Sequence, residues 1–165
     1  TVVLEEFKET VAQEGAPTME EGKSLTFAQK VQKMNVSEKI KLATKGNKEV
    51  RTMLLRDSNK LVVVAAISSP RITDGEILTQ AQNRIAIDDV LRVIYTSREY
   101  VRQYPIKMAL VKNPKVPQAI SMKLLNTLGE KDIKTLAKDK NVPSAIQMFA
   151  KKMIEAKSKN KPGDE

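Results

Sequence analysis

Apolar residues recur along this chain at intervals of three and four, in short stretches that each end at a small polar residue. This spacing places the apolar side chains on one face of a helix. A proline or a basic residue follows soon after the small polar residue, which favours a turn into the next element. The pattern predicts short helices, over residues 24–33, 37–46, 48–56, 59–68, from 73, 88–95, 97–111, 117–128, 131–138 and 143–157.

The small polar residues that end these stretches are themselves regularly spaced. We name them anchors, and they are Asp57, Ser69, Asn83, Ser97, Asn113 and Asp139. Taking every second anchor gives separations of 26, 28 and 30 residues, and the last step, from Asn113 to Asp139, is 26. A two-helix unit of this length is typical of a stacked helical repeat, in which each unit buries its apolar face against its neighbours. The expected fold is therefore all-α, a stack of short helix pairs.

Several local signals refine these helices. Ser24 and Ser37 are the expected N-caps of the helices over 24–33 and 37–46, and Thr73 and Glu76 form a capping-box pattern at a helix start. Pro105 is expected to kink or split the helix over 97–111 near Tyr104. The stretch 61–64 is strand-prone, but it lies within the repeat and no partner strand is apparent, so helix is predicted.

The composition suits a core of closely packed helices. Hydrophobic residues make up 41% of the chain, whereas aromatic residues make up 4% and tryptophan is absent. The core must then be aliphatic. The residues expected in it, at equivalent positions before the corners, are Leu54, Ile67, Leu91, Leu110 and Leu136.

Cysteine and histidine are both absent. Their absence excludes zinc, iron–sulfur and haem sites with the usual ligands, a cysteine nucleophile and any Ser-His dyad. No glycine-rich phosphate loop or triad spacing assembles the remaining polar residues. We therefore expect no enzyme activity and no cofactor. No apolar run approaches the roughly 18 residues of a membrane span and no signal peptide is evident, so a cytoplasmic protein is expected.

Charge divides the chain unevenly. Residues 1–22 hold six glutamates and one lysine, a net charge of −5; the whole chain carries +9, so the other 143 residues carry +14. We expect an acidic arm or linker over 1–22, a helical repeat domain over 23–157 and a disordered polar tail over 158–165.

The acidic arm contains Val3, Phe7 and Val11, which share one face if residues 2–13 are helical. The arm is either a loosely docked end or a peptide whose apolar face binds a partner or a neighbouring copy. Its carboxylates could also compete for the basic surface of the same chain.

The corners, together with Glu49-Val50-Arg51 and Asn113-Pro114-Lys115-Val116-Pro117, resemble those of HEAT-like repeats. The resemblance extends over residues 35–157 and is more specifically to the bacterial leucine-rich-repeat-variant type. It implies a right-handed superhelical stack of short helix pairs, a solenoid that binds along a groove or edge. One subgroup carries an iron–sulfur cluster on a cysteine-rich segment, which a chain without cysteine cannot do.

Cations follow the turns. If equivalent positions line up, they form a basic ladder along one edge. The ladder consists of Lys60, Arg71, Arg84, Arg98, Lys115 and Lys140. Three interpretations stay open: a solvated edge, a surface for an acidic protein, or a surface that follows a phosphate backbone.

A second group combines tyrosine with arginine near the central corner. Its members are Arg92, Tyr95, Tyr100, Arg102 and Tyr104. Tyr100 and Tyr104 are four residues apart, so they are expected to share a helix face. The group could stack bases or hold a peptide, or the rings could be ordinary packing with exposed hydroxyls.

These observations predict a non-catalytic scaffold that binds an acidic protein partner through its basic edge. The alternative is a helical repeat that binds nucleic acid through the same edge. The sequence leaves the partner's identity and the oligomeric state open.

Overall fold

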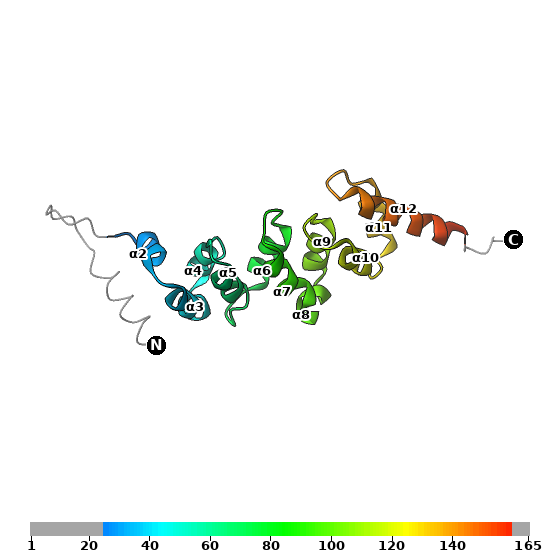
Figure 1. The fold of residues 1–165 in the computed structure, drawn as a ribbon. Helices are drawn as coiled ribbons and strands as arrows, with labels where there is room; N and C mark the ends of the chain where they lie inside the picture. Colours follow the sequence, from blue (N-terminus) through cyan, green and yellow to red (C-terminus); the bar gives the residue numbers. More distant parts are fainter. Residues whose placement is uncertain (1–24, 160–165) are drawn as a thin grey trace, which may run out of the picture. The chain divides into compact units, whose positions relative to one another are not determined.

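The computed structural model describes residues 25–159, and that part of the chain is all-helical, with eleven helices and no strand (Figure 1). The all-α prediction is thus confirmed for this range. The strand-prone stretch 61–64 lies inside α5 (Lys60–Ile67). The chain divides into two compact units, Thr1–Ile72 and Thr73–Glu165, which we name unit 1 and unit 2 and describe separately.

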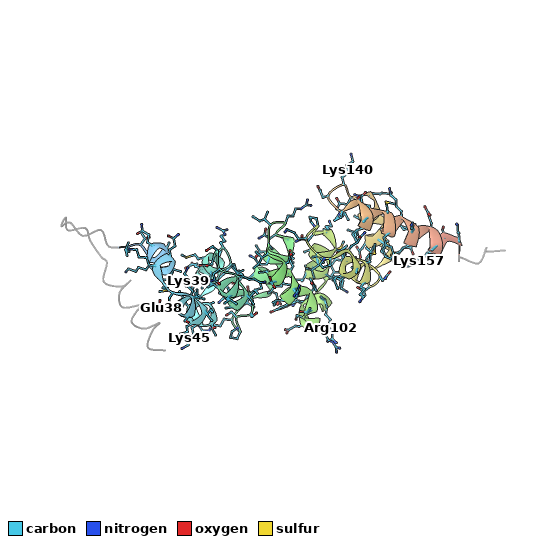
Figure 2. The ribbon with its side chains drawn as sticks, in the orientation of Figure 1. Glu38, Lys39, Lys45, Arg102, Lys140 and Lys157 are labelled. Atoms are coloured by element: carbon cyan, nitrogen blue, oxygen red, sulfur yellow. The ribbon has the colours of Figure 1, made fainter. Side chains whose placement is uncertain are left out.

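Unit 1 contains α2 (Phe27–Lys33), α3 (Val36–Lys45), α4 (Lys48–Leu54) and α5. Helix α3 packs against both α4 and α5. The buried side chains that hold these helices together are aliphatic: Val31, Ala43, Val50, Leu54, Val62 and Ala66. Lys45, at the end of α3, lies outside this core (Figure 2), whereas Arg51 of α4 is buried and its Nη1 donates to the Gly46 carbonyl at 2.9 Å.

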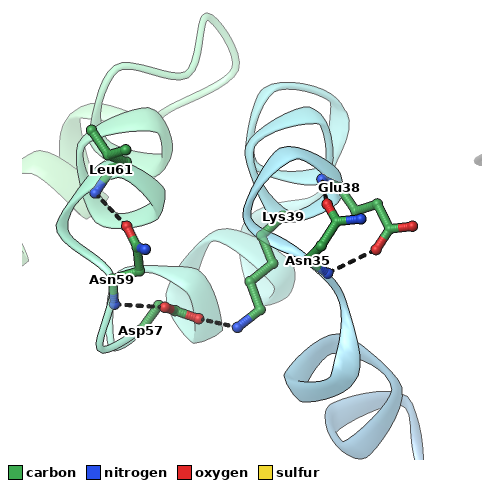
Figure 3. Close-up of polar contacts among 6 residues, drawn as sticks. All are labelled: Asn35, Glu38, Lys39, Asp57, Asn59 and Leu61. Carbon is green, nitrogen blue, oxygen red and sulfur yellow. Dashed lines mark hydrogen bonds and ion pairs between the residues drawn. The ribbon is translucent and has the colours of Figure 1, made fainter.

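The first helices of unit 1 begin with capping boxes. Thr26 caps α2 and Asn35 caps α3. Figure 3 shows the reciprocal bonds at α3, where the Glu38 amide donates to Asn35 Oδ1 at 2.9 Å and the Asn35 amide donates to Glu38 Oε2 at 2.8 Å. The expected cap Ser37 was wrong, because the Asn35–Glu38 pair starts the helix two residues earlier. Ser24, the cap expected for the preceding helix, lies outside the described residues.

A chain of polar contacts ties α3 to the loop before α5 (Figure 3). Lys39 Nζ lies 2.7 Å from Asp57 Oδ2, and Asp57 Oδ1 accepts the Asn59 amide at 2.8 Å. Asn59 in turn caps α5 by accepting the Leu61 amide at 2.9 Å. Burial raises the pKa of Asp57, but the bonds from Lys39 and Asn59 outweigh it and leave this pKa below its ordinary value.

Unit 2 contains α6 (Asp74–Gln82), α7 (Asp88–Thr96), α8 (Arg98–Arg102), α9 (Tyr104–Lys112), α10 (Gln118–Leu125), α11 (Glu130–Lys138) and α12 (Ser144–Lys159). Helix α6 packs on α7 and α9, α9 packs on α8 and α10, and α12 packs on α10 and α11. The capping box predicted at Thr73 and Glu76 is present at the start of α6. Helix α12 extends to Lys159, so residues 158 and 159 of the expected tail are helical, and residues 160–165 lie outside the described residues.

The helix expected over 97–111 is split near Tyr104, as predicted from Pro105. Helix α8 ends at Arg102, Gln103 has extended backbone angles, and α9 begins at Tyr104 with Pro105 in its first turn. Proline is compatible with a first turn because no amide is required there. Tyr100 and Tyr104 therefore belong to different helices, and the expectation that they share a helix face was wrong.

The predicted core residues are buried in both units. Leu54 is 1% exposed, and Ile67, Leu91, Leu110 and Leu136 are fully buried. In unit 2 the core continues through aliphatic residues of α10, α11 and α12, including Leu125, Ile133 and Ile146. The core of each unit is therefore built mainly from aliphatic side chains, as the composition predicts.

Candidate functional site

Four of the six anchors share one turn geometry. The side-chain oxygen of the anchor accepts the amide two residues later: Ser69 from Arg71 at 3.4 Å, Asn83 from Ile85 at 3.0 Å, Asn113 from Lys115 at 2.9 Å and Asp139 from Asn141 at 2.9 Å. The anchor carbonyl accepts the amide three residues later, at 3.1 to 3.4 Å. A short polar side chain is needed at the anchor because it replaces a main-chain acceptor.

The other two anchors are built differently. Asp57 accepts the Asn59 amide, but the next helix then begins at once, with Asn59 as its cap. Ser97 is itself the N-cap of α8 and accepts the Tyr100 amide at 3.4 Å. The six anchors that the sequence groups together are therefore four corners of one kind and two exceptions.

Three of the matching corners lie next to one another in unit 2. They span residues 83–87, 113–117 and 139–143, and we name them the corner stack. Asn113 Nδ2 donates to the carbonyls of Ala81 at 2.7 Å and Asn83 at 3.0 Å. Arg84 Nη2 donates to the Asn141 carbonyl at 2.9 Å. Figure 1 shows the three loops, α6–α7, α9–α10 and α11–α12, along the upper side of the unit.

The corner stack gathers half of the predicted basic ladder. Arg84, Lys115 and Lys140 lie on it, all exposed. Arg98 begins α8, which lies on the opposite side of the unit in Figure 1, and Figure 2 shows Lys140 and Arg102 at these two sides. Lys60 and Arg71 belong to unit 1, where Arg71 Nη1 donates to the Lys45 carbonyl at 3.1 Å. The sequence pattern does not separate the two sides of unit 2, because the corners on both sides have the same small polar residue followed by a cation.

Carboxylates are interspersed among the cations of the corner stack. Lys112 Nζ lies 3.0 Å from Asp139 Oδ2, and Lys115 Nζ lies 3.8 Å from Asp88 Oδ1. The Asn141 amide and then Lys112 hold the pKa of Asp139 below its ordinary value. Asp139 is therefore an anion that fixes Lys112, and the corner stack is a basic surface with acidic members rather than an unbroken row of positive charge.

The corner stack also carries exposed apolar surface. Ile85 is 87% exposed at the tip of the first corner, and Ile87 is 38% exposed at its end. Between them Ala86 is buried, as are Val116 and Val142 at the same position of the next two corners. Ile85 and Ile87 therefore add exposed apolar area beside the cation of Arg84.

A hollow of about 370 Å³ adjoins the corner stack between α6 and α9. Its apolar lining comprises Leu78, Pro105, Met108 and Ala109, and its cations are Arg84 and Lys112. No pattern in the sequence predicts this hollow. Its apolar residues resemble ordinary core positions in the sequence, and only the packing of α6 on α9 brings them together.

The tyrosines of the second predicted group lie in different surroundings. The Tyr104 side chain is 49% exposed, and its hydrogen bond with Asp132 of α11 raises its pKa. Tyr100 is half-buried, and burial, then Glu99 and Asp74, raise its pKa. Tyr95 is half-buried on α7, while Arg92 and Arg102 are exposed. Binding by this group stays a prediction.

Within residues 25–159, acidic side chains form no group of three that could hold a metal ion. No helix in this range has both the length and the apolar character needed to cross a membrane. Comparisons with protein-family models, with curated proteins and with solved structures found no match for this chain.

Proposed function

We propose that this chain is a non-catalytic protein-binding module whose corner stack binds an acidic segment of a partner protein. The observation that carries the proposal is the bonding between the corners. Asn113 and Arg84 each bridge to main-chain carbonyls of another corner, which fixes Arg84, Lys115 and Lys140 along one surface. Cations carried on loops that are already ordered bind an anionic partner without a cost for ordering those loops.

The bond from Asn113 to the Asn83 carbonyl, between consecutive corners, supports a HEAT-like solenoid as the architecture. The bonded corners of unit 2 are 30 and 26 residues apart, as the alternate-anchor spacing requires. A right-handed stack of such pairs would repeat this surface along the chain. Solution scattering of the full chain would test it, since a solenoid gives a more elongated particle than a compact bundle of equal mass.

An acidic protein is favoured over nucleic acid by the composition of the surface. Asp139 and Asp88 lie between the cations and interrupt the row of positive charge that a continuous phosphate backbone would follow, whereas the carboxylates of a peptide can be spaced to match separate cations. Ile85 offers apolar area that a sugar-phosphate chain cannot use well but a protein side chain can. Nucleic acid binding through the same cations is the alternative outcome of the test.

The test measures binding of a fluorescent oligoglutamate peptide and of a DNA oligonucleotide of equal charge to the full chain. We compare the parent with the double variant Lys115→Glu, Lys140→Glu, whose side chains are exposed. The control is Lys123→Glu, Lys151→Glu, an equal charge change at exposed sites on α10 and α12. Circular dichroism checks that each variant is folded.

We expect the corner variant to weaken peptide binding at least tenfold and the control to weaken it far less. Equal losses in both variants would mean that only net charge matters, and the proposal would fail. Tighter binding of DNA than of the peptide, with a steep salt dependence, would instead establish the nucleic-acid alternative.

A further inference from the structure

The hollow beside the corner stack lies entirely within unit 2, where α6 packs on α9. Its wall is apolar and partly open, since Leu78 and Met108 are half-buried and Pro105 is exposed. Its volume of about 370 Å³ is at the lower end of the range for ligand sites, which suits a single side chain better than a large cofactor. An apolar side chain that enters the hollow leaves water, which is favourable.

The charged residues in the described lining of the hollow are both cations, Arg84 and Lys112. Arg84 is exposed and uses Nη2 for the Asn141 carbonyl, which engages one of several guanidinium donors. Lys112 Nζ lies 3.0 Å from Asp139 Oδ2, and the Lys112 side chain is still 40% exposed. Gln82 is exposed in the lining, and its amide can both donate to and accept from a peptide main chain. The hollow therefore combines an apolar wall with groups that bind carboxylates and peptide bonds.

We infer that the hollow receives one large apolar side chain of the partner's acidic segment, while a neighbouring carboxylate of that segment binds Arg84. The inference rests on the proposed function and adds an apolar anchor to the acidic segment that binds the corner stack. Charge complementarity carries the choice of occupant, because the described lining has two cations and no acidic residue. Arg84 connects the two parts of the surface, since it lines the hollow and also belongs to the first corner.

A peptide side chain fits this wall better than a nucleotide base. Among the described residues that line the hollow, none is aromatic, so the stacking surface on which single-stranded nucleic acids depend is missing there. Apolar anchors in partly closed pockets, surrounded by polar groups, are the usual centres of protein–protein binding energy.

The test uses the full chain and two fluorescent oligoglutamate peptides of equal charge, one with phenylalanine at its centre and one with glycine there. We expect the phenylalanine peptide to bind about tenfold more tightly, because its ring leaves water on entering the hollow. Equal affinities for the two peptides would overturn the inference.

The variant Met108→Gln makes the wall of the hollow polar without changing its charge. It should remove most of the preference for phenylalanine and leave binding of the glycine peptide as in the parent. The matched control is Met148→Gln, the same change at a methionine that is 58% exposed on α12 and does not line the hollow. This control should keep the preference, and equal effects of the two substitutions would overturn the inference. Circular dichroism checks that both variants are folded.

A second measurement locates the phenylalanine ring on the parent chain, so it decides the question even if Met108→Gln does not fold. In protein labelled with carbon-13 at the methionine methyl groups, the Met108 resonance should shift more with the phenylalanine peptide than with the glycine peptide. The Met148 resonance should stay in place. Met108→Leu and Met148→Leu assign the two signals. A Met108 resonance that does not move when the phenylalanine peptide is bound would overturn the inference.

Two other occupants of the hollow would give different results. A DNA oligonucleotide of equal charge that shifts the Met108 resonance more than the peptide does would indicate a nucleotide in the hollow. A shift that depends on protein concentration in the absence of peptide would indicate a second copy of the chain. Each of these results would overturn the inference.

Failure of this inference can be distinguished from failure of the proposed function. If the two peptides bind equally and Lys115→Glu, Lys140→Glu still weakens both, the hollow is not used and the proposed function stands. If the preference for phenylalanine depends on Met108 while neither peptide depends on Lys115 and Lys140, the hollow binds the side chain and the proposed role of the corner stack fails.

Discussion

The side-chain amide of Asn113 donates a hydrogen bond of 2.7 Å to the main-chain carbonyl of Ala81, 32 positions earlier in the chain. Asn113 is 3% exposed, and its Nδ2 also donates to the Asn83 carbonyl while its Oδ1 accepts the Lys115 amide. One buried side chain thus closes its own corner and joins the preceding one.

Replacing Asn113 should destabilise unit 2 more than replacing an exposed asparagine. Asn113→Ala leaves buried carbonyls and an amide without this partner, at a cost of about 1–3 kcal/mol. Asn113→Asp should cost more, because a carboxylate would face two carbonyl oxygens. Urea unfolding provides the measurement, with Asn126→Ala, at an exposed site, as a control expected within about 0.5 kcal/mol of the parent.

Two glycines should respond to alanine in opposite directions. A Cβ at Gly46 would lie 2.7 Å from the Leu42 carbonyl oxygen and 2.7 Å from Val50 Cγ1, so Gly46→Ala should destabilise by about 1–3 kcal/mol. A Cβ at Gly75 meets nothing within 4 Å, and Gly75→Ala in α6 should stabilise by about 0.4–1 kcal/mol. Thermal unfolding of both variants checks the pair, and a loss of stability at position 75 would contradict the geometry.

The core residues before the corners should each be costly to truncate. Leu54→Ala in unit 1 and Leu110→Ala in unit 2 remove side chains that are 1% and 0% exposed, and each should lose about 2–5 kcal/mol of unfolding free energy. Leu61→Ala is the matched control, because Leu61 is 63% exposed. Similar losses at all three sites would show that α5 packs through a different face.

Acid should weaken the link between Lys39 and Asp57. Because the folded pKa of Asp57 is lowered, its contribution to stability is complete above about pH 5 and is lost as the pH falls through the folded value. Asp57→Asn should therefore be less stable than the parent at neutral pH, and the difference should shrink on acidification. Urea unfolding of both proteins between pH 7 and pH 3 measures this; a difference that stays constant would mean that the Asp57 charge is not involved.

The sequence predicts most reliably what depends on neighbours in the chain. The capping box at Thr73 needs only Glu76 three residues on, and both are present as expected. The cap at Ser37 was wrong because Asn35 competed for the same role. Likewise, Pro105 indicated a break, but the pattern could not distinguish a kink from the extended Gln103 that separates α8 from α9.

Tertiary relationships were only partly predictable. The alternate-anchor spacing pairs Asn83 with Asn113, and the bond between them is present. The predicted basic ladder combines cations from corners on both sides of unit 2. It therefore includes Arg98, whose helix α8 lies on the side opposite the corner stack. The hollow between α6 and α9 depends on how far Leu78 and Met108 remain uncovered, and no periodicity in a single sequence carries that information.

In each corner of unit 2, the residues that form the turn and pack into the core are different from the residues that face solvent. The anchor and the apolar residue three positions later make the turn and the packing, whereas the two residues between them are exposed: Arg84 and Ile85, Pro114 and Lys115, Lys140 and Asn141. Apart from Arg84, which donates to the Asn141 carbonyl, these positions can exchange side chains at little cost to stability. Natural variation or laboratory selection confined to them could change what the protein recognises, from acidic to basic or apolar targets, while the same helices fold beneath.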